Sequence, residues 1–339
     1  MSAAEFTPRE ARARSRRLRS SNPVVRLVTV RLLFGVITLL LVSLVIFAAT
    51  QALPGNAAYS VLGRSATPAR LHAVEDQLKL NRPLTAQYTS WIGGVLHGNF
   101  GKSLANGESV SSLIGSRVAN SATLVIFAGL IGTLVAGGLG ILAAARRDTW
   151  LDHTLSTIAL ALAALPEFVV GLLLVVIFSV TVSHLLPAVS AIPPGTEPWS
   201  VPKELILPVA TLALVVAPYI FRIARGAMVE ALESDYLEMA RLKGVAPARA
   251  LLLHALPNAI PPIVQVVGLN LLYLAGGIVV VEYVFNYPGI GAALVDAVSN
   301  RDIPTIQFIV LLLTTFYVFV NITTDVIALL ASPRRRTSR

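Results

Sequence analysis

Few residues of this chain stand at the spacing that catalysis or nucleotide binding requires. Gly101-Lys102-Ser103 matches the end of a phosphate-binding loop, but that loop needs another glycine five positions earlier, where Leu96 stands. The metalloprotease pattern His-Glu-x-x-His is absent, the five histidines are scattered, and no carboxylate pair or Ser/His/Asp group recurs at a useful spacing. We therefore expect no enzyme, no metal site and no cofactor bound by this chain.

The most informative polar segment is residues 234–257, a helix–glycine–helix pattern that we call the elbow. Asp235 followed by Glu238 makes an N-terminal capping pattern, and Gly244 can take the left-handed conformation that ends a helix. Pro247 suits the first turn of a second helix. The sequence thus predicts two short helices joined at Gly244, a compact knob on which a soluble motor protein could push.

The composition indicates that the helices on either side of the elbow lie in a membrane. Of 339 residues, 55% are hydrophobic and 13% are charged, and the mean hydropathy is +0.73, whereas soluble proteins average about 25% charged. Apolar runs of about 20 residues can cross a bilayer as helices. Six such runs predict an all-α membrane protein with six transmembrane helices: 32–52, 121–145, 155–183, 205–221, 260–281 and 306–330. The fourth is the shortest and carries Pro208 and Pro218.

Arginine and lysine placement orients these helices, because cytoplasmic flanks are enriched in both residues. Basic residues cluster before the first run and after the second, fourth and sixth runs, whereas the loops after the third and fifth runs hold only Lys203 and Arg301. The long first external loop is also basic, but loops longer than about 60 residues largely escape this rule. We therefore expect both termini and the elbow to be cytoplasmic.

The predicted organisation has a soluble part after the first helix, within which Thr67 caps a helix over 68–79. The net charge of +9 lies at membrane flanks, which favours anionic lipid headgroups rather than nucleic acid as partners. In chain order we expect a basic cytoplasmic tail at 1–30, a transmembrane helix at 31–52, an extracytoplasmic subdomain at 53–118, a five-helix core at 119–333 and a basic tail at 334–339.

Ionisable and amide side chains inside the apolar runs are the candidates for a translocation path. Glu167 follows Pro166 inside the third run, where burying a charge costs about 2.5 kcal/mol or more. It either lines a path or satisfies backbone donors at a proline kink, and the sequence leaves both readings open. Asn270 and Asn321 are weaker path candidates, because interhelical hydrogen bonding explains them, and also Asp325, better than substrate binding does.

Small residues recur at every fourth position of the second run, at Gly132, Ala136, Gly140 and Ala144. This spacing places all four on one side of a helix, where another helix can approach closely. We expect a helix-packing face there.

A second motif follows the fifth run at residues 282–302, which we call the Pro-Gly turn. Its proline and glycines predict a turn and then a short apolar helix that ends near Asn300. The segment is either a plain external connector or a part of the assembly. Its motif residues are Glu282, Phe285, Pro288, Gly289 and Gly291.

The elbow resembles the EAA loop of bacterial ATP-binding-cassette (ABC) importer permeases, written Glu-Ala-Ala, three residues, Gly, nine residues, Ile-x-Leu-Pro. Met239 and His254 depart from the pattern, whereas the matching positions are Glu238, Ala240, Gly244, Leu256 and Pro257. Further matches to the dipeptide and oligopeptide subfamily are Asp235, Tyr236, Arg241 and Lys243. The Pro-Gly turn is similar to the Glu-x-Val-Phe-x-x-Pro-Gly-x-Gly element of the same permeases.

The resemblance implies a type I ABC importer transmembrane fold, with a coupling loop at about 225–258 and an external turn-helix at about 283–305. It implies a permease subunit of the bacterial inner membrane that translocates di- or oligopeptides delivered by an extracytoplasmic binding protein. The other implied partners are a second homologous permease and two cytosolic ATPase subunits, which would hold ATP and magnesium.

Other cargoes and other classes of protein remain alternatives. Related permeases carry nickel, glutathione or sugars, and nothing in the apolar runs distinguishes these cargoes. A transporter or channel that works without an ATPase would usually show internal repeats or broken helices in matched halves, which the sequence does not reveal. A membrane receptor could also bind a partner through the elbow without moving any substrate.

Overall fold

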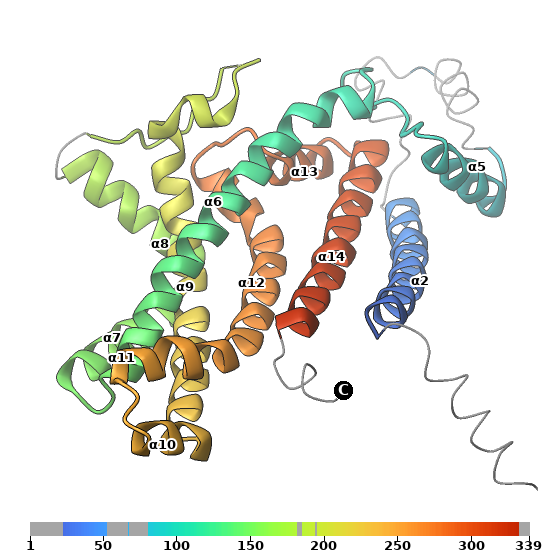
Figure 1. Cartoon of the computed structure of the whole chain (residues 1–339). Coiled ribbons are helices and arrows are strands. Elements are labelled where there is room, and N and C mark those ends of the chain that lie inside the picture. The colour runs from blue at the N-terminus through green and yellow to red at the C-terminus, as the bar shows by residue number, and fades with distance from the viewer. Residues whose placement is uncertain (1–22, 53–66, 68–80, 182–184, 194, 332–339) are drawn as a thin grey trace, which may run out of the picture.

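A computed structural model of the chain describes residues 23–52, 67, 81–181, 185–193 and 195–331. Within these residues the fold is helical, without a β-sheet (Figure 1). The helices are α2 (Pro23–Gln51), α5 (Leu84–Leu96), α6 (Val110–Ala145), α7 (Trp150–Ala163), α8 (Glu167–Val175), α9 (Pro202–Leu232), α10 (Asp235–Leu242), α11 (Pro247–Arg249), α12 (Leu256–Val284), α13 (Ile290–Ser299) and α14 (Ile303–Ala331). Two π-helical segments, Val176–Thr181 and Ala250–Ala255, follow α8 and α11.

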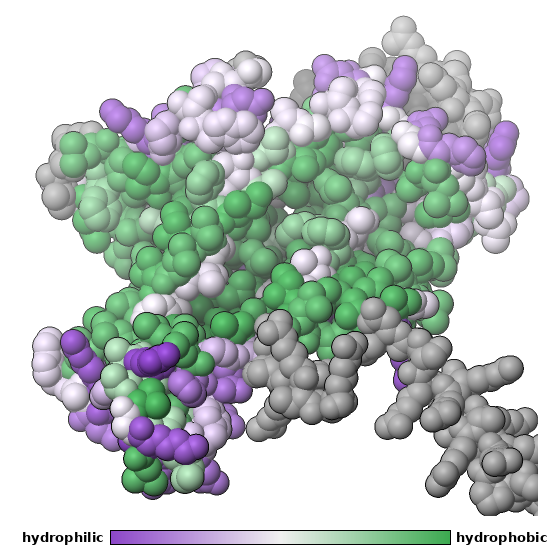
Figure 2. Space-filling view, in the orientation of Figure 1, coloured by the Kyte–Doolittle hydropathy of each residue, from purple (hydrophilic) through white to green (hydrophobic). Residues whose placement is uncertain are grey.

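The predicted count of six membrane spans fits the long apolar helices of the described residues. Five helices are long and apolar enough to cross a membrane: α2, α6, α9, the unit Pro247–Val284 and α14. A sixth span is formed if α7 and α8, which are bent by 104° at a short break, count as one. Figure 2 shows a broad hydrophobic band across the middle of the visible face, with hydrophilic residues at both ends.

The third span is broken, and the prediction of one continuous helix over 155–183 is wrong. α7 ends at Ala163, and α8 begins at Glu167, directly after Leu165-Pro166. Proline has no backbone N–H and disfavours the helical conformation of the residue before it. Glu167 therefore lies at the start of a half-helix, at the break within this bent span. No matching break is found elsewhere in the part of the chain that the structure describes.

The first helix begins earlier than expected, which shortens the predicted basic tail 1–30. α2 starts at Pro23 and contains Arg31, whose Nε lies 2.5 Å from Oδ2 of Asp325 on α14. The ion pair gives this arginine a partner within a helical segment. It also confirms the predicted interhelical role of Asp325.

α6 also begins earlier, inside the predicted subdomain 53–118. The Ser109 hydroxyl accepts the Ser112 N–H at 3.5 Å and caps the helix. Val110 and Ile114 are buried in a cluster with Ile290 of α13 and other residues of α13 and α14. This packing explains why the helix continues beyond the apolar run 121–145.

The fourth and fifth spans extend well past their predicted ends. α9 runs continuously from Pro202 to Leu232 with Pro208 and Pro218 inside it. α12 continues backward through the π-helical segment and α11 to Pro247. The sixth span, α14, ends close to the predicted boundaries 306–330.

The small-residue face predicted on the second span is confirmed by the contact between α6 and α9. A Cβ atom added to Gly140 would lie 2.7 Å from the carbonyl oxygen of Phe221 on α9, and one added to Gly132 would lie 3.1 Å from a methyl of Val216. The first contact is with backbone, so a side chain at Gly140 would require the helices to move apart, and the second is tighter than ordinary van der Waals contact. α6 and α9 therefore pack closely along this face.

The elbow and the Pro-Gly turn lie at opposite ends of the bundle, which we call the elbow end and the turn end. The start of α2 and the end of α14 lie at the elbow end, and α13 lies at the turn end (Figure 1). At the turn end α5 packs near α2 through Tyr88 and Trp91, whose rings contact Phe47. The helix predicted over 68–79 falls outside the described residues.

Candidate functional site

The elbow has the predicted left-handed glycine at its joint. Gly244 has a φ of +79°, and its N–H donates to the carbonyl of Arg241 at 2.9 Å. The N–H of Val245 donates to the carbonyl of Ala240 at 3.1 Å. These two bonds form the Schellman motif that ends a helix at glycine. The joint is therefore a defined turn.

The start of α10 differs from the predicted capping pattern. The residue at the N-cap is Ser234, and Asp235 is already the first residue of the helix. The Ser234 hydroxyl donates backward to the carbonyl of Ala231 at 2.6 Å and makes no capping bond to α10. Asp235 and Glu238 instead place negative charge in the first turn, where it interacts favourably with the helix dipole.

The sequence predicted a separate second helix in the elbow, and this prediction is wrong. Pro247 occupies the first turn of α11 as expected, but α11 passes through the π-helical segment directly into α12. Asn258 of α12 donates to the Tyr236 hydroxyl at 3.0 Å and to the carbonyl of His254 at 2.8 Å. The elbow is therefore one short helix, α10, folded back against the continuous start of the fifth span.

One face of α10 holds the elbow to the bundle. Leu237 is buried in a cluster with Met228 and Ala231 of α9 and Ala255 of the π-helical segment, and Ala240 is buried as well. The opposite face presents large apolar side chains to solvent, together with the charges of Glu238, Arg241 and Lys243. The exposed apolar residues of the elbow are Tyr236, Met239, Leu242, Leu252 and Leu253.

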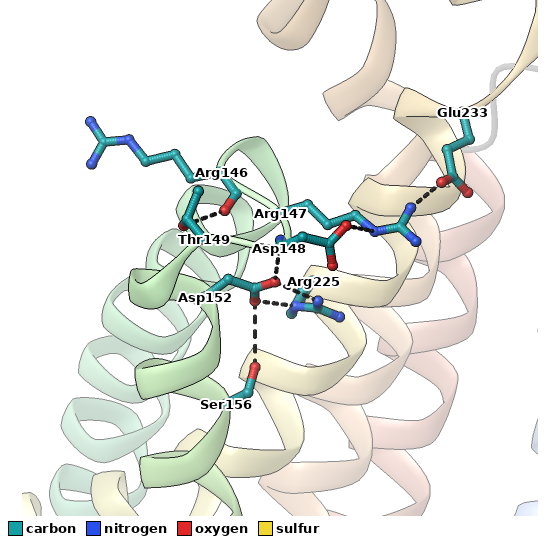
Figure 3. Close-up of polar contacts among 8 residues, drawn as sticks. All are labelled: Arg146, Arg147, Asp148, Thr149, Asp152, Ser156, Arg225 and Glu233. Carbon is teal, nitrogen blue, oxygen red and sulfur yellow. Dashed lines mark hydrogen bonds and ion pairs between the residues drawn. The ribbon is translucent and has the colours of Figure 1, made fainter.

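A charged cluster fixes the base of the elbow. Arg225 of α9 donates from Nε and Nη2 to the two carboxylate oxygens of Asp152 on α7, at 2.6 and 2.7 Å (Figure 3). Asp152 is only 1% exposed and also accepts the N–H of Asp148 at 3.1 Å. Nearby, Arg147 pairs with Glu233, the last residue before the elbow. The α6–α7 connection is thus tied to α9 and to the first residues of the elbow.

This cluster was not predicted from the sequence, although the sequence contains a signal for it. Asp152 lies at the edge of the third apolar run and Arg225 just after the fourth. An acid and a base at the same predicted end of two spans are candidates for pairing, but 73 residues separate them. Only the packing of α7 on α9 brings them into bidentate contact.

At the turn end, Glu282 is the centre of a buried polar network. Its carboxylate accepts the hydroxyl of Ser121 on α6 at 2.5 Å and the N–H groups of Gly291 and Ala292 at 2.7 and 3.0 Å. Ser121 in turn accepts the N–H of Ile290 at 2.8 Å. The side chain of Glu282 thus caps α13 from within the protein and joins α12, α13 and α6.

The glycines of the turn act differently from the prediction. The left-handed residue is Asn286, with φ +48°, and its N–H and that of Tyr287 make the same pair of helix-ending bonds as at Gly244. A Cβ added to Gly289 would lie 2.0 Å from Oε1 of Glu282, and one added to Gly291 would lie 2.5 Å from Cα of Val279. These glycines make room for the carboxylate and for close helix contact rather than supplying positive φ.

Further hydrogen bonds join the Pro-Gly turn to α6. The buried hydroxyl of Tyr287 donates to the carbonyl of Asn120 at 2.9 Å, and the Asn120 amide donates to the carbonyl of Pro288 at 2.7 Å. Burial, and secondarily the charge of Glu282, raises the pKa of the Tyr287 hydroxyl above its ordinary value, so it remains a donor. Phe285 is fully buried.

The Gly101-Lys102-Ser103 segment is part of this same end. Gly101 has a φ of +84°, and the Ser103 hydroxyl donates to the carboxylate of Asp302, which also accepts the Leu104 N–H at 2.9 Å. The segment is therefore a structural loop docked on the start of α14. This agrees with the interpretation that it is not a phosphate-binding loop.

The three path candidates are not brought together by hydrogen bonds. Asn270 donates to the carbonyl of Val266 and Asn321 to that of Tyr317, each four residues back on its own helix. Among the residues that the structure describes, both amides thus bond within their own helices, and the expected interhelical bonds are not found. Glu167 lies against Gly277 of α12, where an added Cβ would be 2.5 Å from its Oε2. No group of side chains that could hold a metal occurs in the described ranges.

Comparison with known families and relatives agrees with this architecture. Residues 136–337 match the family described as "Binding-protein-dependent transport system inner membrane component", and residues 24–125 match the N-terminal domain of such membrane components. The chain is 36% identical over 307 residues to a probable peptide ABC transporter permease protein, y4tP, of Sinorhizobium fredii, covering 90% of this chain and 97% of that protein. It is 38% identical over 306 residues to the glutathione transport system permease protein GsiC of Salmonella choleraesuis, with the same coverage of both chains.

A solved structure supports the fold. An inward-facing structure of the MetNI methionine ABC transporter matches with a TM-score of 0.52 at 17% identity, covering 65% of this chain and 96% of that one. At this identity the likeness concerns the fold alone, and it confirms the predicted type I importer fold. The chain therefore belongs to the family of inner membrane components of binding-protein-dependent transport systems, the multi-pass permease subunits of ABC importers.

Proposed function

We propose that the chain is the permease subunit of an importer for short peptides, with di- and oligopeptides as its main cargo. The support is the names of its relatives, one a peptide permease and others glutathione permeases; glutathione is itself a tripeptide. In this proposal a second homologous permease completes the path, two cytosolic ATPase subunits bind ATP and magnesium, and an extracytoplasmic binding protein delivers the peptide. Glutathione is the second candidate cargo.

The observation that carries the coupling role is the outer face of the elbow. Tyr236, Met239 and Leu242 follow one another at three-residue spacing on α10 and are exposed, although the inner face is fully packed. Large apolar side chains gathered on a polar end of a protein indicate a contact surface for another protein. We assign this surface to the ATPase, which places the elbow end in the cytoplasm and the turn end outside.

The proposal predicts that the elbow can be damaged without unfolding the permease. Gly244→Pro is incompatible with φ +79° and removes a helix-ending N–H. We expect the variant complex to insert and assemble, but ATP-driven uptake of a labelled tripeptide into proteoliposomes should fall at least tenfold relative to ATP hydrolysed.

A matched control exists at the opposite end. Gly98 follows α5 with φ +76°, and Gly98 and Asn99 make the same two helix-ending hydrogen bonds. Gly98→Pro makes the same backbone change away from the elbow and should leave the ratio of uptake to ATP hydrolysis unaltered. Normal coupling in Gly244→Pro, or equal loss in both variants, would contradict the assignment of the elbow.

A further inference from the structure

The break in the third span carries a carboxylate that the coupling mechanism does not use. Glu167 begins α8 after the 104° bend, and its side chain lies on the backbone of α12 at Gly277. Its Oε2 is buried, and it has no hydrogen-bond partner among the residues that the structure describes. A buried polar atom of this kind is costly unless another group pairs with it. A donor from outside the described residues would satisfy this oxygen.

The surroundings of Glu167 indicate which kind of group would bind there. Tyr273 lies one helical turn before Gly277 on α12, on the side of the helix that Glu167 contacts, and Tyr219 lies on α9. The two tyrosines are 50% and 43% exposed, so their rings remain accessible. The Tyr219 ring is contacted by the Arg222 guanidinium, 5.8 Å from its centroid, which leaves Tyr273 as the open ring.

A carboxylate beside an open aromatic ring is a site for an organic cation. The carboxylate accepts charge-assisted hydrogen bonds from an ammonium group, and the ring face attracts the same charge. A sugar hydroxyl also donates to a carboxylate, but it brings no positive charge to compensate the carboxylate or to interact with the ring face. Nickel favours imidazole or thiolate ligands, and no cluster of potential metal ligands is found within the described residues.

We propose that Glu167, with Tyr273 beside it, binds the free α-ammonium group of the transported peptide during its passage. The inference rests on the proposed function, since it concerns the cargo of the same permease. It makes Glu167 a specificity residue that distinguishes peptides with a free N-terminus from blocked peptides. Peptides and glutathione both carry the required group.

The test is direct binding to the purified complex of both permeases and the ATPases in nanodiscs, without the binding protein. The probes are trialanine and N-acetyl-trialanine, measured by calorimetry. We expect the wild-type complex to bind trialanine at least tenfold more tightly than the blocked peptide. Glu167→Gln should lose this preference, and Glu167→Asp should restore part of it.

Controls separate a binding role from a purely structural one. Glu204 occupies the first turn of α9 and accepts the Ala191 N–H at 3.1 Å, so Glu204→Gln removes a comparable carboxylate charge elsewhere and should keep the preference. Equal binding of the two probes by the wild type, or no binding of either, overturns the proposal. Failure of Glu167→Gln to assemble also overturns it, because Glu167 would then pair with the second permease.

The failure of this inference can be told apart from failure of the proposed function. ATP-dependent uptake of trialanine by the reconstituted wild-type complex with its binding protein reports on the function alone. If uptake occurs but the probes bind equally, the permease carries peptides without reading their N-terminus through Glu167. If no peptide is taken up, the proposed cargo itself is wrong.

Discussion

The elbow and the Pro-Gly turn each contain a helix that ends with the same pair of backbone hydrogen bonds, at Gly244 and at Asn286. Their surfaces nevertheless differ. The glutamate of the turn, Glu282, is fully buried and bonded to three donors, whereas the glutamate of the elbow, Glu238, faces solvent. Two motifs with the same backbone ending can therefore serve different purposes. The Pro-Gly turn stabilises the fold through buried hydrogen bonds, whereas the elbow presents exposed side chains to a partner.

The largest expected effect separates the two glutamates. Glu282→Leu leaves the Ser121 hydroxyl and two N–H groups without their acceptor, which should cost about 3 kcal/mol or more of stability. Glu238→Leu lies on the surface and should change stability by less than about 0.5 kcal/mol. Thermal unfolding of the purified permease in detergent measures both. Equal midpoints for the two variants would break the comparison.

A smaller effect separates two glycines. Gly291→Ala places a Cβ 2.5 Å from Cα of Val279, a backbone atom, so α13 must move away from α12, at about 2 kcal/mol. Gly244→Ala meets no atom within 4 Å and carries only the strain of its positive φ, about 1 kcal/mol. The same unfolding measurement ranks the two. A larger loss for Gly244→Ala would show that the elbow is the more tightly packed region.

The smallest effect separates two tyrosine hydroxyls. Tyr287→Phe removes a buried bond to the Asn120 carbonyl and should cost about 1 kcal/mol. Tyr236→Phe removes a solvent-exposed bond from Asn258 and should cost about 0.5 kcal/mol or less. Chemical denaturation at matched protein concentration resolves the difference. Comparable losses would indicate that the elbow, too, depends on its own polar contacts.

Much of the fold could be predicted from apolar run length alone, because a bilayer requires helices of a fixed minimum length. The helix ends could not. α6 begins early because Ser109 caps it and because Ile114 packs on residues that are distant in sequence. The break at Pro166 was missed because a proline in an apolar run is compatible with either a mild kink or a 104° bend.

The candidate sites show the same limit. The left-handed Gly244 was predictable because local backbone chemistry decides it. The role of Glu282 was not predictable, because one of the donors to its carboxylate, Ser121, lies 161 residues away in the sequence. The pairing of Asp152 with Arg225 likewise depends on which helices meet. Long-range contacts, rather than local propensity, decide where buried charges find their partners.

The continuity of α9 has a mechanical consequence. This helix begins near the turn end, packs closely against α6, and runs without interruption to Leu232, just before the elbow. Thirty-one residues at about 1.5 Å each make a rod about 46 Å long. If this helix tilts by about 5° about one end, its other end moves by about 4 Å. A small rotation of α9 at one membrane face would therefore shift residues at the opposite face by about the size of a side chain.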